Sequence, residues 1–177
     1  MTTEPRTHSP AQLASALLTL LQPHTKEATI AGSIRRGRPD PHDIEIVLIP
    51  GDDLFDFHLA GLRLRPDPSH LRDGPRYKRR LYDGFPIDLF IVLPPADWGL
   101  TLAIRTGSAE FSQALLARWK RVSGGGFSQG GRLYTPTGRH HPTPSEDDVF
   151  EACGLRWYEP NERDAARAAT IAGLKGR

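Results

Sequence analysis

Apolar and polar residues recur with two different periods along the chain, and these periods separate helices from strands. Leucines at helical spacing follow Ser9-Pro10, a common helix start, and predict an amphipathic helix over about residues 10–22. Shorter apolar runs that stop at turn-forming residues predict core strands over residues 28–31 and 44–49. The first third of the chain is therefore expected to form a helix followed by two strands.

The same alternation continues to the C-terminal end. Residues 54–62 predict a short helix, and residues 76–82 and 86–93 predict a hairpin that turns at Asp83-Gly84. A helix-loop section begins at residue 95, and Phe111, Leu115 and Trp119 mark one face of the next helix, which ends at residues 123–126. Hairpin-like segments and a short helix near residues 146–153 follow.

This order predicts an α/β (α+β) fold with a mixed β-sheet flanked by helices. We place a larger unit at residues 1–107 and a small α+β subdomain at residues 108–177. The length, 177 residues, suits one domain or two small lobes. With 38% hydrophobic and 25% charged residues, neither the disordered nor the membrane class is favoured, and no apolar run approaches the ~20 residues of a membrane span.

The N-terminal residues lack the apolar stretch of a signal peptide, and Cys153 is the single cysteine, which excludes an internal disulfide framework. We therefore expect a soluble, cytoplasmic monomer. The formal net charge is only +2, but residues 76–80 and 118–121 form basic stripes and residues 145–148 are acidic. Basic stripes of this kind suit a polyanionic partner, and the alternative is that they are solvated faces.

The chemistry of the chain concentrates in a glycine-serine turn and the strand that follows it. Gly32-Ser33 precedes two arginines and Gly37, and six residues later Asp43 and Glu45 alternate with buried positions. Side chains alternate along a strand, so the two carboxylates point to one side. Gly32 permits close approach of a phosphate, Ser33 supplies a hydroxyl and an N–H, and Arg36 can bind phosphate oxygens.

Asp88 stands inside a second apolar strand, where an unpaired carboxylate is costly. If that strand neighbours the strand of Asp43, three carboxylates share one face, and their repulsion favours neutralisation by hard divalent cations such as Mg²⁺ or Mn²⁺. Two such ions are able to activate a hydroxyl and stabilise a leaving pyrophosphate. The alternative for Asp43 and Glu45 is an exposed edge strand with solvated acids.

Four segments in register resemble a known family. Residues 32–37 with Asp43-Ile44-Glu45 resemble the GSxRRG…DxD signature of the family X DNA polymerases, in the polymerase-β-like nucleotidyltransferase superfamily. Asp88 looks like the third catalytic aspartate of that family. Residues 98–112 resemble its WGxxLxxxTGSxxFN segment, and residues 145–163 its closing segment. The resemblance spans about residues 28–164 and implies a minimal form with only the palm and the C-terminal nucleotide-selection subdomain, since 27 residues leave no room for an N-terminal lyase domain.

The resemblance implies a DNA polymerase that adds nucleotides from (d)NTP to a primer 3′-hydroxyl, in gap-filling repair synthesis. Asp43 and Glu45 would bind two Mg²⁺ or Mn²⁺ ions, and Asp88 would bind the catalytic ion and help deprotonate the hydroxyl. The nucleotide-binding residues implied by position are Gly32, Ser33, Arg36, Arg105, Thr106, Gly107 and Ser112. Primer-template or gapped DNA would bind through surface charges at Lys78, Arg79, Lys120, Arg121 and Arg132.

Several positions depart from the family pattern. Glu45 replaces the usual second aspartate, Ile104-Arg105 replace a Tyr-Phe pair that discriminates against the ribose 2′-hydroxyl, and Ser112 replaces an asparagine that reaches the base. Pro86 occupies a position where a basic residue is frequent, so no arginine is assigned to orient Asp88. The alternatives are a template-independent or ribonucleotide-adding enzyme, a catalytically degenerate nucleic-acid-binding module and, third, a small-molecule nucleotidyltransferase.

Overall fold

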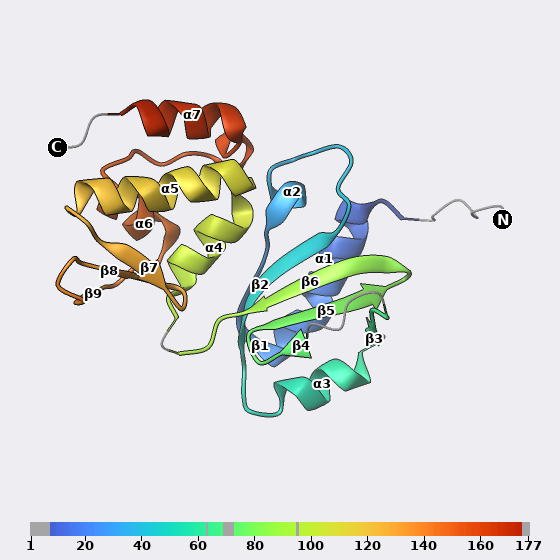
Figure 1. Cartoon of the computed structure of the whole chain (residues 1–177). Coiled ribbons are helices and arrows are strands. Elements are labelled where there is room, and N and C mark those ends of the chain that lie inside the picture. Colours follow the sequence, from blue (N-terminus) through green and yellow to red (C-terminus); the bar gives the residue numbers. More distant parts are fainter. Residues whose placement is uncertain (1–7, 63, 69–72, 95, 175–177) are drawn as a thin grey trace.

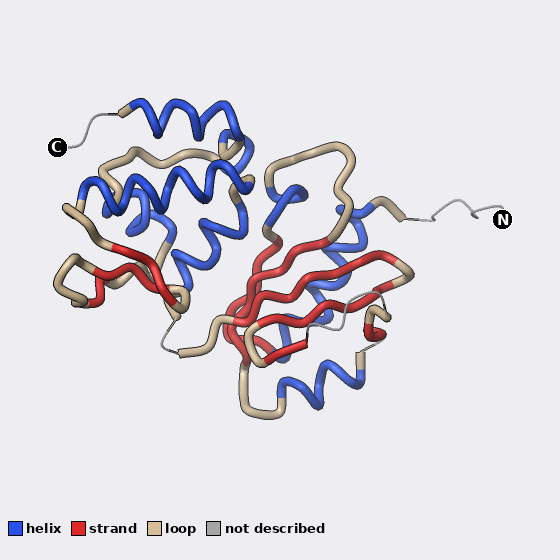
Figure 2. The backbone as a smooth tube through the Cα atoms, viewed as in Figure 1, coloured by secondary structure: helices blue, strands red, loops and turns tan. Residues whose placement is uncertain are grey.

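The computed structural model describes residues 8–62, 64–68, 73–94 and 96–174. Two lobes lie side by side (Figure 1). The N-terminal lobe contains a mixed sheet with helices against it, and the C-terminal lobe contains four helices and a small antiparallel sheet (Figure 2). The fold is mixed α+β with a mixed sheet flanked by helices, as the sequence predicts.

The large sheet has the strand order β1-β2-β6-β5-β3, and β4 pairs with β5 beside this path. Only β2 and β6 run parallel, and the other pairs are antiparallel. The parallel pair lies inside the sheet, so each of its strands is hydrogen-bonded to a neighbour on both sides. The strands are β1 (Thr25–Ile30), β2 (Ile44–Pro50), β3 (Arg65–Pro66), β4 (Asp73–Gly74), β5 (Tyr77–Tyr82) and β6 (Phe85–Ile91).

Side chains alternate along β2 and β6, so both strands contribute residues to each face of this sheet. Helices α1 (Pro10–Leu21) and α3 (Phe55–Gly61) contribute to the core on one face. The strand residues in that core are Ile44, Ile46, Leu48, Ile87, Leu89 and Ile91. The alternate residues Val47 and Phe90 point to the other face, where they cluster with Leu102 of the C-terminal lobe. One face thus supplies the core, and the other meets the second lobe.

The C-terminal lobe is built on a separate apolar core. Leu100, Phe111, Leu115 and Phe150 belong to this core, and Trp119 lies at its edge. Because Leu100 is in α4, the core of this lobe begins before residue 108. Its elements are α4 (Trp98–Thr106), α5 (Ala109–Val122), β7 (Phe127–Gln129), β8 (Arg132–Tyr134), β9 (His140–His141), α6 (Glu146–Ala152) and α7 (Ala165–Gly173).

Most predicted elements form at their expected places. Two helices were not predicted: α2 (Gly32–Arg35), which occupies the expected glycine-serine turn, and α7. One-turn 3₁₀ helices follow α1 and precede α7, at Gln22–His24 and Pro160–Glu162. Residue 95, where we placed the start of the helix-loop section, lies outside the described residues. No described helix is long and apolar enough to cross a membrane.

Candidate active site

The three predicted carboxylates gather on one face of the large sheet. Strands β2 and β6 are parallel neighbours, and Glu45 pairs directly with Asp88. Asp43 lies two positions before Glu45, just ahead of the strand. All three share the face of Val47 and Phe90, which is turned toward α4. The adjacency of the two strands is confirmed, and the alternative of an exposed edge strand is wrong because β2 lies between β1 and β6.

Burial and mutual repulsion make this cluster electrostatically costly. Burial raises the pKa of Glu45 to about 7, and the negative charges of Asp43 and Asp88 contribute to this rise, against Arg105 and Arg36. Burial, with the charge of Asp88, also raises the pKa of Asp43. Asp43 and Glu45 thus hold negative charge that the surrounding side chains do not fully compensate.

Arg79 on β5 is the side chain that orients Asp88, a role that the sequence did not suggest. Its Nη1 donates to both carboxylate oxygens of Asp88, at 2.8 and 3.0 Å. Its Nε donates to Asp67 at 3.1 Å, and Nη1 lies 4.0 Å from Asp43. The hydroxyl of Tyr77 donates a further hydrogen bond of 2.8 Å to Asp88. Arg79, on the neighbouring strand, therefore orients the Asp88 carboxylate in place of a basic residue at the position of Pro86.

A signal for this pairing is present in the sequence. Asp83 and Gly84 have φ of 48° and 73°, as a two-residue type I′ turn requires. A two-residue turn makes Tyr82 and Phe85 partners and fixes each preceding pair along the hairpin. When the residue pairs are counted back from the turn, Arg79 falls opposite Asp88.

The glycine-serine turn contacts this cluster through its first residue. Gly32 has a φ of +61°, and a Cβ added to it would lie 1.7 Å from Oε2 of Glu45. The Glu45 carboxylate therefore rests on the backbone of Gly32. Ser33 follows in the short helix α2, and its side chain is half-buried. The turn is thus joined to the carboxylates by direct contact.

The two arginines after this turn bind the C-terminal lobe. Arg36 donates from Nη1 to the carbonyl of Thr106 at 2.6 Å, and its buried Nε has no hydrogen-bond partner among the described residues. Arg35 donates to the Thr106 hydroxyl at 2.6 Å and to both oxygens of Glu146 at 3.0 and 2.6 Å. Fully buried Arg163 donates to the same carboxylate. Arg35 therefore joins the lobes, and Arg36 keeps one donor for a further acceptor.

The other predicted nucleotide-binding residues border this junction. The guanidinium of Arg105 lies 4.0 Å from the centre of the Phe90 ring, and its charge acts on Glu45 and Asp88. Gly107 follows the last residue of α4, and a Cβ added to Gly107 would lie 2.5 Å from the side chain of Phe111. The hydroxyl of Ser112 donates to the carbonyl of Ile104 at 2.7 Å. The Ser112 hydroxyl thus fastens α5 to α4.

Two of the five basic residues predicted to contact DNA are not surface charges, which corrects that expectation. Lys78 is buried and pairs with Asp56 of α3 at 3.2 Å, because alternation along β5 turns it to the helix-covered face. Arg79 points to the opposite face and binds Asp88 and Asp67, so both side chains are committed to carboxylates of their own lobe.

Lys120 and Arg121 are exposed in the last turn of α5, and Arg121 donates to the carbonyls of Ala172 and Leu174. Arg132 is half-buried on β8. Contacts of these three with DNA stay predictions.

The carboxylates suit the predicted divalent ions by their chemistry. Asp43, Glu45 and Asp88 supply hard oxygen ligands and excess negative charge, which Mg²⁺ or Mn²⁺ would neutralise. Within the described ranges, however, no group of three or more acidic, histidine or cysteine side chains is arranged to hold a metal ion. Both oxygens of Asp88 are engaged by Arg79. The donor set therefore fits the ions, and a complete ligand arrangement is not preformed.

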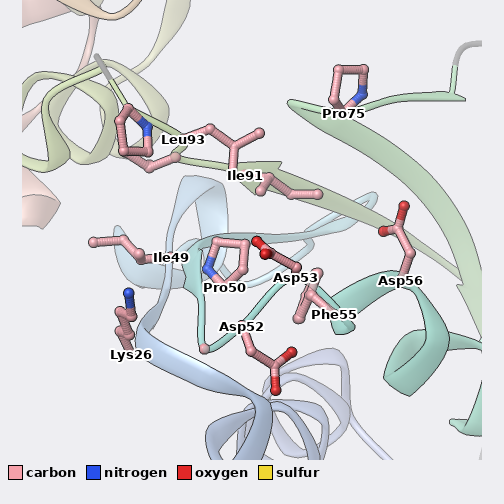
Figure 3. A pocket seen from close by; sticks show the side chains of 13 residues that line it. Lys26, Ile49, Pro50, Asp52, Asp53, Phe55, Asp56, Pro75, Ile91 and Leu93 are labelled. Carbon is pink, nitrogen blue, oxygen red and sulfur yellow. The ribbon is translucent and has the colours of Figure 1, made fainter.

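A cavity of about 450 Å³ lies at the opposite ends of β2 and β6 (Figure 3). Ile49, Pro50 and Ile91 form part of an apolar wall, and Asp52 and Asp53 add carboxylates. None of the three predicted catalytic carboxylates lines it. The cavity is therefore separate from the candidate active site.

Residues 101–164 match the family model of the DNA polymerase beta thumb. The matched segment runs from α4, which covers the carboxylate face, through α6, which carries Glu146, to Asp164. The C-terminal lobe is thus similar to a DNA polymerase beta thumb.

Proposed function

We propose that this chain is a metal-dependent DNA polymerase that adds nucleoside monophosphates from (d)NTP to a primer 3′-hydroxyl, in gap-filling repair synthesis. The observation that carries the proposal is the gathering of Asp43, Glu45 and Asp88 on the sheet face turned toward the thumb-like lobe. Carboxylates at such a junction would hold the divalent cations that a reaction between two polyanions, the primer end and a triphosphate, needs.

Asp43, Glu45 and Asp88 would hold two Mg²⁺ or Mn²⁺ ions. When bound, such ions activate the hydroxyl and neutralise the leaving pyrophosphate. Asp88 accepts the proton of the primer 3′-hydroxyl, and Arg79 keeps its carboxylate oriented. The 3′-oxygen then bonds to the α-phosphorus as the bond to the β-phosphate oxygen breaks.

The remaining residues of the site would hold the nucleotide. The free Nε of Arg36 supplies a donor for phosphate oxygens, beside the backbone of Gly32 and Ser33. Thr106 and Gly107 end α4 at the same junction and would border the sugar and base. Arg105 and Ser112 stand on the adjoining helices, beside Phe90 and Ile104, and would line the nucleotide site.

One observation favours a second candidate, a catalytically degenerate nucleic-acid-binding module. Arg79 engages both oxygens of Asp88, and Arg36 is committed in part to Thr106. A protein that only binds DNA has no need to release Asp88 for a metal ion. Binding of gapped DNA without any nucleotide incorporation would support this candidate.

Primer extension separates the two candidates. The wild type is tested on gapped, nicked and single-stranded primers, with dNTP or NTP and with Mg²⁺ or Mn²⁺. Asp43→Ala and Asp88→Ala should abolish incorporation and pyrophosphate release while circular dichroism shows an intact fold. Asp40→Ala, an exposed carboxylate nearby, is the matched control. Substantial turnover by both catalytic variants would overturn the assignment, and NTP addition without a template would indicate the template-independent enzyme.

A further inference from the structure

Three aromatic side chains form a row across the small sheet of the C-terminal lobe. Phe127 of β7 pairs with Tyr134 of β8, and Tyr134 pairs with His140 of β9. Directly paired residues point to the same face of a sheet, and the rings are in contact. The rings of Phe127 and Tyr134 are stacked at 5.1 Å and 14°, and those of Tyr134 and His140 are 6.0 Å apart at 52°.

The opposite face of this small sheet packs inside the lobe. Leu133 alternates with Tyr134 and is fully buried, and its partner His141 contacts the ring of Trp119 at 5.0 Å. The indole N–H of Trp119 also donates to the carbonyl of Tyr134. Helix α5 therefore covers the back of the sheet, and the aromatic row lies on the front.

The row is anchored at one end and open at the other. His140 Nε2 lies 2.8 Å from the carboxylate of Asp97, which fixes the inner end. Phe127 stands on β7, the edge strand, and is 43% exposed. Among the described residues four large hydrophobic side chains are exposed, and Phe127 is the aromatic one of them. The next position in the stack, beyond Phe127, is therefore accessible to solvent.

A positive charge shares the front face of the small sheet with the aromatic row. Arg132 pairs with Gln129, two residues along from the Tyr134–Phe127 pair, so Arg132 lies on the same front face. Exposed Lys120 lies in the last turn of α5, behind the sheet, and exposed Arg139 precedes β9, at the His140 end of the row. Asp97 adds a carboxylate at the inner end only. An exposed ring beside arginines is the combination that single-stranded nucleic acids recognise, by base stacking and phosphate contact.

We infer that the aromatic row is a stacking platform for unpaired bases of a single-stranded DNA template. A base extends the stack on the outer face of Phe127, and the adjoining phosphates lie near Arg132. The inference rests on the proposed function, because it takes DNA as the partner. It goes beyond that function by assigning the unpaired template strand to the front of β7–β9, a surface away from the three carboxylates.

Fluorescence anisotropy with two labelled oligonucleotides of equal length and charge tests this inference. One is an oligothymidylate and the other is abasic, so that only the first can stack. Stacking on an aromatic side chain contributes about 1–3 kcal/mol per base, so Phe127→Ala should weaken oligothymidylate binding about 5- to 140-fold. Abasic binding should be weaker in the wild type and little changed by the substitution. Phe127→Trp should retain oligothymidylate affinity.

Leu174→Ala removes another exposed hydrophobic side chain and is the matched control, with unchanged binding expected. Thermal melting verifies that each variant is folded. Equal wild-type affinity for both oligonucleotides, or unchanged binding by Phe127→Ala, would overturn the platform while leaving DNA binding and polymerase activity in place. Failure of the wild type to bind any DNA would instead overturn the proposed function together with the platform.

Discussion

Arg79 lies directly opposite Asp88 on the neighbouring strand, and its guanidinium binds both oxygens of the Asp88 carboxylate. The same guanidinium also binds Asp67, which precedes β4 in the chain. One cation thus connects the predicted catalytic aspartate to a second carboxylate in the N-terminal lobe. The direction of Asp88 is set by protein contacts alone, as positioning of a reactive group requires.

Replacing Arg79 should affect both stability and activity. Arg79→Ala leaves two nearly buried carboxylates without their cation, and should lower the free energy of unfolding by about 3 kcal/mol. Arg79→Lys keeps the positive charge but loses the planar guanidinium. It should therefore unfold at a higher urea concentration than Arg79→Ala and still incorporate nucleotides slowly. Urea unfolding and single-turnover incorporation measure the two effects.

Arg80→Ala serves as the control for this pair of variants. Arg80 binds Asp73, an exposed partner, and its loss should change the free energy of unfolding by about 1 kcal/mol or less. Wild-type unfolding and incorporation by Arg79→Ala would contradict the positioning role.

Glu45 should make stability depend on pH in metal-free buffer. Burial first, and then the neighbouring aspartates, raise the pKa of Glu45 from 4.5 to about 7. The folded state thus binds the proton more tightly than the unfolded chain. The stability that Glu45 contributes by binding this proton is therefore fully present below pH 4.5. It is lost as the pH rises through about 7. Glu45→Gln should therefore raise the melting temperature at about pH 8 in EDTA, with a smaller gain at about pH 5.

Glu151→Gln, on the exposed surface of α6, should show no such pH-dependent gain. Mg²⁺ or Mn²⁺ should stabilise the wild type more at about pH 8 than at about pH 5, because cations bind the ionised carboxylate. A melting curve of Glu45→Gln that parallels the wild type at every pH would refute the assignment of this pKa.

Gly32 should tolerate no side chain. Gly32→Ala places a Cβ 1.7 Å from the Glu45 carboxylate and also strains a φ of +61°. Gly37 has a φ of +70° and nothing within 4 Å of an added Cβ, so Gly37→Ala should show the backbone strain alone, about 1 kcal/mol. We expect Gly32→Ala to lose more stability in urea unfolding than Gly37→Ala and to lose incorporation. Equal losses of stability in the two variants would show that the Glu45 side chain moves away from the added Cβ at no cost in free energy.

The junction between the lobes should depend on Glu146. This carboxylate binds Arg35 and fully buried Arg163, so Glu146→Gln leaves two arginines with a neutral partner. Breaking a buried pair costs about 3–5 kcal/mol, and hydrogen exchange should rise first in α6 and in the segment that holds Arg163. Glu162→Gln disrupts the more exposed pairs with Arg156 and Arg167 and should cost much less stability than Glu146→Gln. Identical exchange in the two variants would contradict this role.

Local pattern was sufficient to predict the frame of the site. Alternation put Asp43 and Glu45 on one side and Ile44 on the other, and the apolar run around Asp88 marked a second buried strand. These features depend on neighbouring residues in the sequence, and the strand period of two makes them readable. Pairing of the two strands was stated only as a condition, and the sheet order satisfies it.

Contacts between side chains that are distant in the sequence could not be predicted from local pattern. Lys78 pairs with Asp56 and Arg79 with Asp67, and no local pattern links either cation to that carboxylate. Arg35 is 111 residues from Glu146, and no local pattern links them. Helix α7 was missed as well, and its apolar face is recognisable only against the α5 core that it completes.

The turn at Asp83-Gly84 gives the hairpin an unusual sensitivity to length. Hairpin tips on protein surfaces ordinarily accept an inserted residue at little cost. Here one extra residue would shift β5 by one position against β6 and bring Lys78 or Arg80 opposite Asp88 in place of Arg79. The chain would still have a hairpin and the same side chains, but Arg79 would lie on the opposite face of the sheet from Asp88. The length of a solvent-exposed loop therefore constrains the proposed site as much as the identity of any side chain in it.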